Sequence, residues 1–138
     1  MIAYVDSSVL LSLVLAERDP LDVLLGAHER VTSLLTEVEC LRALETARWT
    51  GRLTVGEACE RRIIVHDQLR RMRRIALVAP IVRRAGEAFS TPLKALDALH
   101  IATALVWRER RAPELVFATH DLHQARAAAA LGFEIVGV

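Results

Sequence analysis

The chain opens with Ile2-Ala-Tyr-Val-Asp6-Ser7-Ser8, a short apolar run that ends at an acid and is followed by two hydroxyl residues. The run has the length of a buried strand, and the two serines can cap a helix that begins near Val9. A strand followed directly by a helix is the unit from which parallel α/β sheets are built. This stretch therefore predicts the first strand–helix unit of an α/β domain.

The same alternation of strand and helix signals continues to the end of the chain. Further strands are predicted at Val31–Leu34, Ile75–Ala79, Leu115–Ala118 and Phe133–Val136. Helices are predicted from Val9, from Pro20 through Leu25, from Leu35 to Gly51, over 54–73, over 81–89, from Pro92 to about Arg108, and over Leu122–Leu131. Strands that alternate with helices need crossover connections, which predicts a central, mainly parallel sheet with helices on both faces.

The composition is typical of one globular domain. The chain has 138 residues, of which 53% are hydrophobic and 25% charged, so we expect a single domain over residues 1–138 rather than a disordered chain. Aromatic residues make up only 4% of the chain, which favours helices packed on a small sheet over a base-stacking platform of aromatic side chains. The sequence contains neither a signal peptide nor a membrane-spanning stretch, so we expect a cytoplasmic protein with no membrane partner.

The two cysteines, Cys40 and Cys59, lie in segments that are predicted to be helical. They form no C-x-x-C motif and neither is adjacent to a histidine, so zinc binding and thiol–disulfide chemistry are poorly supported. We therefore expect both to be buried structural residues.

Two acids follow predicted strands directly. Asp6 ends the first strand, and Asp121 lies between the strand at Leu115–Ala118 and the next helix. Each position suits a helix N-cap, and each also lies at the carboxyl edge of the sheet, where the functional crevice of a parallel sheet is found. Capping alone explains two acids at equivalent topological positions less easily than a shared functional site does.

Asp97 lies within one of the most apolar helical segments of the chain. Its neighbours at helical spacing are Leu93, Ile101, Ala104 and Leu105. A carboxylate among them costs several kcal/mol unless it is paired or bound to a metal. Lys94 could pair with it, and a position early in the helix helps through the macrodipole. We nevertheless interpret Asp97 as a functional rather than a structural residue.

A fourth acid must be chosen between Glu37 and Glu39, which flank the apolar stripe of Leu35, Val38 and Leu41. Helical periodicity does not distinguish them, because each lies to one side of that stripe.

Four motifs of the sequence resemble the acidic motifs of the PIN-domain ribonucleases, and most closely those of VapC-type toxins. These motifs are Tyr4-Val-Asp6-Ser-Ser8, Ser33-x-x-Thr36-x-x-Glu39, Leu96-Asp97-Ala-Leu-His-Ile-Ala-Thr-Ala104 and Ala118-Thr-His-Asp121. The resemblance covers the whole chain and implies a three-layer α/β/α sandwich. It selects Glu39 over Glu37. It also implies an endoribonuclease that leaves 5′-phosphate and 3′-hydroxyl ends, a VapB-type antitoxin as partner, and a homodimer or larger toxin–antitoxin assembly.

The expected site therefore consists of Asp6, Glu39, Asp97 and Asp121, acting as catalytic residues and as metal ligands directly or through water. Two carboxylates about 4 Å apart repel by roughly 4 kcal/mol at an effective dielectric constant of about 20, so either some of the acids take up protons or hard divalent cations neutralise them. Oxygen ligands favour Mg²⁺ or Mn²⁺ over zinc. Such an ion activates water, neutralises phosphate oxygens and stabilises the leaving 3′-oxygen.

Three neighbouring polar residues are interpreted as supporting ones. The hydroxyls of Ser8 and Thr119 could orient the carboxylates. His100 follows Asp97 by three residues, but a lone histidine in an apolar helix is more often a hydrogen-bonded core residue. We therefore leave His100 outside the catalytic set.

The net charge is only +1, yet 17 of the 18 cationic side chains are arginines, which suit bidentate contact with RNA phosphates. The alternative is a solvated helix face that is partly paired with Glu57, Glu60 and Asp67. The arginine clusters comprise Arg61, Arg62, Arg70, Arg71, Arg73, Arg74, Arg83, Arg84, Arg108, Arg110 and Arg111.

Other functions fit the sequence less well. A phosphoacceptor receiver domain needs an acidic pair after the first strand and a lysine after a late strand, but the only lysine is Lys94. A haloacid-dehalogenase-type phosphatase needs an acid at position 8, where this chain has Ser8. The remaining alternative is a catalytically silent PIN-like module that binds RNA or an antitoxin, although such modules normally lose acids and all four are present here.

Overall fold

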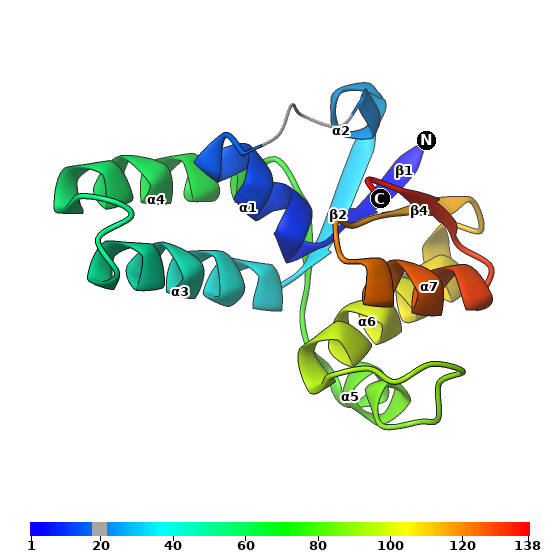
Figure 1. Ribbon diagram of the computed structural model, residues 1–138. Helices are drawn as coiled ribbons and strands as arrows, with labels where there is room; N and C mark the ends of the chain where they lie inside the picture. The colour runs from blue at the N-terminus through cyan, green and yellow to red at the C-terminus, as the bar shows by residue number, and fades with distance from the viewer. Residues whose placement is uncertain (18–21) are drawn as a thin grey trace.

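The computed structural model describes residues 1–17 and 22–138. The strands are β1 (Ile2–Val5), β2 (Glu29–Ser33), β3 (Arg73–Ile75), β4 (Leu115–Ala118) and β5 (Glu134–Val136). The helices are α1 (Ser7–Leu15), α2 (Asp22–Gly26), α3 (Leu35–Trp49), α4 (Val55–Arg70), α5 (Ala79–Ala85), α6 (Ala95–Arg111) and α7 (Leu122–Ala130). Figure 1 shows α3 and α4 running side by side away from the sheet, while α5, α6 and α7 lie on its other side.

The strands form one sheet in the order β3-β2-β1-β4-β5, and every pair is parallel. The β1 strand is central and pairs with β2 on one side and β4 on the other, with Val5 opposite Ala118. All strands consequently end at the same edge, which gathers the residues that follow β1, β2 and β4. The predicted three-layer α/β/α architecture with a parallel sheet is confirmed.

The pleat of the central strands separates two apolar cores. Ala3 and Val5 of β1 and Val116 of β4 pack against α1, α3 and α4, whereas Tyr4 and Phe117 point to the opposite face, toward α6 and α7. Both faces of the central strands are therefore buried, as a parallel sheet covered by helices requires. This packing fixes the positions from which the polar residues at the carboxyl edge project.

Several predicted boundaries are wrong, most clearly around β3. The strand predicted at Ile75–Ala79 is β3 at Arg73–Ile75, so its two arginines are strand residues and not the end of the charged helix. Because β3 is an edge strand, such charges are tolerated and they also discourage pairing with another sheet. The next helix begins at Ala79 instead of 81, because proline is favoured in the first turn of a helix.

The first helix also starts earlier than predicted. It begins at Ser7, and its N-cap is Asp6, whose side chain accepts a hydrogen bond from the backbone N–H of Ser8. The helix predicted from Pro92 is α6, which begins only at Ala95 and continues to Arg111. The predicted helix start at Pro20 lies outside the described residues.

The cysteine prediction is half right. Cys40 is buried in α3, where burial raises the pKa of its thiol to about 12, but Cys59 is exposed on α4.

The helices in the described part of the chain include none that is both long and apolar enough to cross a membrane.

Candidate active site

The carboxyl edge of the sheet positions the four predicted acids from four different elements. Asp6 follows β1 and caps α1, and Asp121 follows β4 and caps α7. Glu39 lies in the early part of α3, directly after β2, and Asp97 lies in the first turn of α6. Both interpretations of Asp6 and Asp121 are thus compatible, since each caps a helix and each lies at the edge where a functional crevice is expected.

Asp6 is buried and held by donors from three elements. Its Oδ2 accepts hydrogen bonds from the Ser8 hydroxyl at 2.6 Å, the Ser8 backbone N–H at 3.1 Å and the Thr119 hydroxyl at 3.2 Å. Its Oδ1 accepts from the amide nitrogen of Gln124 at 3.2 Å. Ser8 and Thr119 therefore orient the Asp6 carboxylate, as the sequence predicts, and Gln124 is an additional donor.

His100 connects Asp6 with Glu39 inside the protein. Its Nε2 lies 2.5 Å from Glu39 Oε1 and 3.6 Å from Asp6 Oδ1, and its Nδ1 lies 2.8 Å from the Tyr4 hydroxyl. Burial lowers the pKa of His100, but the hydrogen bond to Glu39 and the charges of Asp6, Glu39 and Asp97 raise it by more, so the net shift is upward. A protonated His100 can therefore balance part of the negative charge of the two acids.

Asp97 and Asp121 line a cavity of about 340 Å³ together with Pro92, Leu93, Lys94 and His123. Burial raises the pKa of Asp97, and repulsion from the carboxylates of Asp121, Asp6 and Glu39 raises it further. All four acids therefore act electrostatically on the same small region, although His100 partly offsets the effect. The surroundings of Asp97 therefore favour its protonated form over its ionised form.

Asp97 and Asp121 also differ in how the protein contacts them. Asp121 Oδ1 accepts the backbone N–H groups of His123 at 2.8 Å and Gln124 at 3.0 Å, which is ordinary helix capping. Within residues 1–17 and 22–138, the Asp97 side chain takes part in no hydrogen bond or salt bridge, and the pairing with Lys94 that the sequence permits is not formed.

The structure also distinguishes the two glutamates that spacing alone leaves open. Glu37 lies toward the surface, where it pairs with Arg74 at 3.0 Å and approaches His66 at 3.8 Å. Glu39 instead contacts His100 and contributes to the field on Asp97. Of the two glutamates, therefore, only Glu39 contacts the residues around Asp6 and acts on Asp97.

The four acids do not form a preassembled metal cage. The described residues contain no group of three or more His, Cys, Asp or Glu side chains that could hold an ion together. The donors at the cavity are nevertheless carboxylate oxygens, and Mg²⁺ is commonly held by only one or two carboxylates with water and substrate phosphate completing its shell. The donor chemistry at Asp97 and Asp121 therefore fits such an ion.

Sequence reasoning missed Gln124 and set His100 apart from the acids. Gln124 is 1% exposed, and its Oε1 has no hydrogen-bond partner among the described residues. A glutamine three residues after Asp121 in an alanine-rich helix was the available signal. His100 is indeed a buried, hydrogen-bonded residue, but its partners include one of the four acids.

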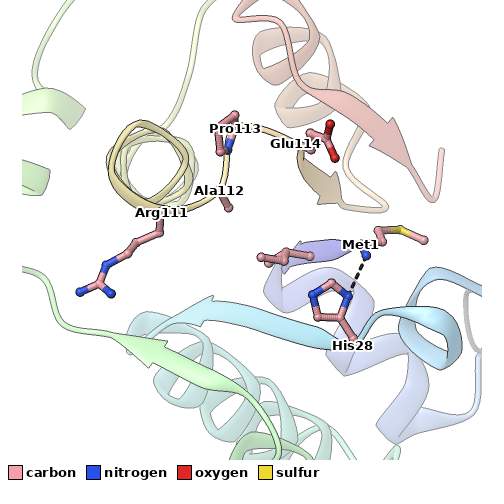
Figure 2. A pocket seen from close by; sticks show the side chains of 7 residues that line it. Met1, His28, Arg111, Ala112, Pro113 and Glu114 are labelled. Atoms are coloured by element: carbon pink, nitrogen blue, oxygen red, sulfur yellow. Dashed lines mark hydrogen bonds between the residues drawn. The ribbon is translucent and has the colours of Figure 1, made fainter.

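A second cavity of about 410 Å³ lies at the opposite edge of the sheet, around Met1 and His28. Figure 2 shows the Met1 amino group facing the His28 ring, with 2.7 Å between the nitrogen and Nδ1. One carboxylate, that of Glu114, lines this cavity, so it lacks the repelling acids of the carboxyl edge. The acidic cavity is therefore the stronger candidate for an active site.

Comparisons with solved structures agree with the fold. The chain is similar to a toxin–antitoxin complex from Klebsiella pneumoniae, with a TM-score of 0.66 and 19% identity over 97% of this chain and 95% of that one. It is similar to VapBC2 from Rickettsia felis bound to a promoter DNA fragment, with a TM-score of 0.66 and 13% identity over 99% and 98% of the two chains. It is also similar to PAE2754 from Pyrobaculum aerophilum, with a TM-score of 0.65 and 18% identity over 99% of this chain and 84% of that one.

At these identities the structural similarities establish the fold alone. No curated protein matches the sequence. The PIN domain family model, however, matches residues 3–130, which include all four acids and every strand except the last. The chain therefore belongs to the PIN domain family.

Proposed function

We propose that this PIN domain is a Mg²⁺- or Mn²⁺-dependent endoribonuclease, and that it is the toxin of a VapBC-type toxin–antitoxin pair acting in the cytoplasm. The observation that carries the proposal is the position of Asp97 in the cavity, where burial and the three other acids raise its pKa and its side chain has no hydrogen-bond or salt-bridge partner among the described residues. A protein that needed this acid only for stability would have paired it.

Asp97 and Asp121 are the residues that would hold the cation at the cavity, with Asp6 and Glu39 contributing directly or through water. Two features favour this assignment: the donors are oxygens, and the repulsion on Asp97 is the kind that a divalent cation removes. When bound, the ion would lower the pKa of a water, neutralise phosphate oxygens and stabilise the leaving 3′-oxygen.

The remaining contacts define what the protein itself contributes. Ser8, Thr119 and Gln124 hold the Asp6 carboxylate in one orientation, so that it meets the substrate without reorganising. The Oε1 atom of Glu39 is hydrogen-bonded to His100 Nε2, whereas its Oε2 atom takes part in no hydrogen bond in the described part of the chain. That free oxygen can orient the attacking water and accept its proton.

The proposed partners are a VapB-type antitoxin and a second copy of the chain. Two of the similar structures are described as toxin–antitoxin complexes, and they resemble this chain over almost its full length. Large apolar side chains are exposed on the helical arm formed by α3 and α4, which is a suitable surface for either partner. These side chains are Val38, Trp49, Val55 and Ile63.

The alternative is a silent module that binds RNA or an antitoxin without cutting. It is favoured by one observation, the absence among the described residues of any group of three potential metal ligands. The presence of all four acids at one edge favours the enzyme.

Cleavage of labelled RNA pools with Mg²⁺, with Mn²⁺ and with chelator tests the proposal. We expect cation-dependent cleavage that falls by about 10³-fold or more in Asp97→Asn and Asp6→Asn, equivalent to about 4 kcal/mol of transition-state stabilisation. Circular dichroism would establish that both variants remain folded. RNA binding without cleavage under every condition would favour the silent module, and cleavage that survives chelation or Asp97→Asn would overturn the proposed site.

A further inference from the structure

A third cavity, which we name the Trp107 pocket, lies between the edge strand β3 and the helices α5 and α6. Its volume is about 260 Å³, below the roughly 300–1,000 Å³ of typical small-molecule sites. It is lined by Arg74, Ile75, Ala76, Val78, Ile81, Val106, Trp107, Arg110 and Arg111. Its size therefore suits one nucleotide or a comparable group better than a large ligand.

The pocket is positively charged although the chain as a whole is nearly neutral. Three arginines and no acid line it. Arg74 pairs with Glu37 outside the pocket, but Arg110 and Arg111 have no carboxylate partner within 4.0 Å among the described residues. Arg111 lines both the Trp107 pocket and the Met1 cavity, and Figure 2 shows its guanidinium group pointing away from Met1, His28 and Glu114. Two guanidinium groups are thus available to an anion.

Three arginines at the end of α4 and the start of β3 differ in this respect. Arg70 and Arg71 both pair with Asp67, and Arg73 pairs with Glu29. This agrees with the interpretation of that cluster as a partly paired surface. These three guanidinium groups are already neutralised by carboxylates, whereas, within the described part of the chain, Arg110 and Arg111 at the Trp107 pocket are not.

Trp107 gives the pocket an aromatic wall. Its ring lies 5.4 Å from the guanidinium carbon of Arg73 and 6.0 Å from that of Arg111, within the range of cation–π attraction. Its indole N–H is shielded from solvent and has no hydrogen-bond partner among the described residues, which is unusual for a buried donor.

The pocket and the acidic cavity share one helix. Asp97 lies in the first turn of α6 and Trp107 ten residues later, so the two are about 15 Å apart along the helix axis. Arg74, which lines the pocket, pairs with Glu37 on α3, the helix that also carries Glu39. One extended strand of RNA can therefore occupy both cavities.

We propose that the Trp107 pocket binds one nucleotide of the RNA strand whose scissile bond lies at the acidic cavity. The base packs against Trp107 and the apolar side chains, and the phosphate is held by Arg110 and Arg111. This inference rests on the proposed ribonuclease function. A flat aromatic wall beside guanidinium groups matches a base joined to a phosphate, because stacking and bidentate phosphate contact use those two groups.

Tryptophan fluorescence tests the pocket without requiring cleavage. The chain has two tryptophans, and Trp49 is 74% exposed on α3, so Trp49→Phe leaves Trp107 as the only reporter. In low salt, nucleoside monophosphates should change the Trp107 emission saturably. The double change Arg110→Ala/Arg111→Ala should weaken that binding at least tenfold, whereas the matched control Arg126→Ala, an exposed arginine on α7, should not.

Three results would overturn the proposal: no saturable change with any nucleoside monophosphate, binding unaffected by the double arginine change, or tight binding of inorganic phosphate or an acidic peptide but not of nucleotides. Each would mean that the pocket is not a nucleotide site. Circular dichroism would confirm that the double variant is folded, and Arg110→Lys/Arg111→Lys should restore part of the binding by retaining the charge.

Cleavage assays separate this proposal from the proposed activity. Asp97→Asn should abolish cleavage and keep the nucleotide-dependent fluorescence change. The double arginine variant should lose cleavage at least tenfold on long RNA, but not on oligonucleotides too short to occupy both cavities. If wild type binds nucleotides and cuts no RNA, the proposed activity fails while the pocket remains. Equal losses of cleavage by the double arginine variant on short and long RNA would contradict the role of the Trp107 pocket as a subsite.

Discussion

The four acids form two pairs that the protein treats differently. The inner pair, Asp6 and Glu39, lies behind the cavity and is bound by protein donors: the Asp6 side chain is 5% exposed and accepts four hydrogen bonds, and Glu39 contacts His100. The outer pair, Asp97 and Asp121, lines the cavity, and Asp97 has no such partner among the described residues. The protein therefore stabilises Asp6 and Glu39 with its own donors but, in the part of the chain that is described, leaves the Asp97 side chain without one, and Asp97 is where the proposed cation would bind.

Asp6→Ala should break the inner pair and cause the largest loss of stability. The change removes a helix N-cap, which typically costs about 1 kcal/mol, and leaves buried donors of Ser8, Thr119 and Gln124 without their acceptor, at about 1–3 kcal/mol. We expect the free energy of unfolding to fall by about 2–4 kcal/mol in urea titrations. Asp121→Ala, which removes a cap that is only partly buried, should cost less. Equal losses would remove the distinction between inner and outer acids.

Divalent cations should stabilise the protein through the outer pair. A ligand that binds only the folded state at about 100 times its Kd contributes about 2.7 kcal/mol. Thermal unfolding of wild type should therefore shift upward with Mg²⁺ or Mn²⁺, and the shift should largely disappear in Asp97→Asn. A shift of the same size in both proteins would place the cation somewhere else.

The pH dependence of stability should report on His100. Burial lowers the folded-state pKa of His100, but Glu39, Asp6 and Asp97 raise it by more. The protonated ring therefore stabilises the fold, and this contribution is complete below the unfolded pKa of about 6.5. That contribution is lost as the pH rises through the folded pKa. In chelator, wild type should lose stability above pH 6.5, and His100→Gln should show a flatter profile. A steeper profile in the variant would contradict the assignment.

The smallest expected effect is a gain in stability, which we expect from Asp97→Asn in the absence of metal. Because burial and three like charges raise the pKa of Asp97, its ionised form weakens the metal-free fold at neutral pH. Its partial exposure screens the repulsion, so we expect Asp97→Asn to raise the Tm by only about 1–3 °C in chelator. Differential scanning calorimetry would measure it, with Glu37→Gln as a control. A lower Tm for Asp97→Asn would mean that the carboxylate is structurally required.

The sequence was sufficient to predict the fold where apolar runs and turn signals coincide. The segment Ile2–Val5 and the strand Leu115–Ala118 are buried on both faces, and their hydrophobicity alone identifies them. The strand β3 was misplaced because its arginines resemble the end of the preceding charged helix, and only its pairing with β2 distinguishes the two. Cys59 is exposed, contrary to the prediction of a buried thiol, because the absence of metal and redox motifs does not reveal which face of α4 meets α3.

The site was only partly predictable for a related reason. Asp6 and Asp121 follow strands, so topology places them at one edge. The preference for Glu39 came from the family resemblance, because the distinguishing facts are contacts with residues remote in sequence: His100 is 61 residues from Glu39, and Arg74 is 37 residues from Glu37. The Gln124 donor to Asp6 spans 118 residues, which no local pattern encodes.

Binding of Mn²⁺, followed by the loss of the free-ion signal in electron paramagnetic resonance, tests the central claim most directly. Wild type and Glu37→Gln should take up Mn²⁺, while Asp97→Asn should take up at least tenfold less at the same concentration. Equal uptake by Asp97→Asn, or none by folded wild type at millimolar Mn²⁺, would contradict an acidic site that depends on a hard cation.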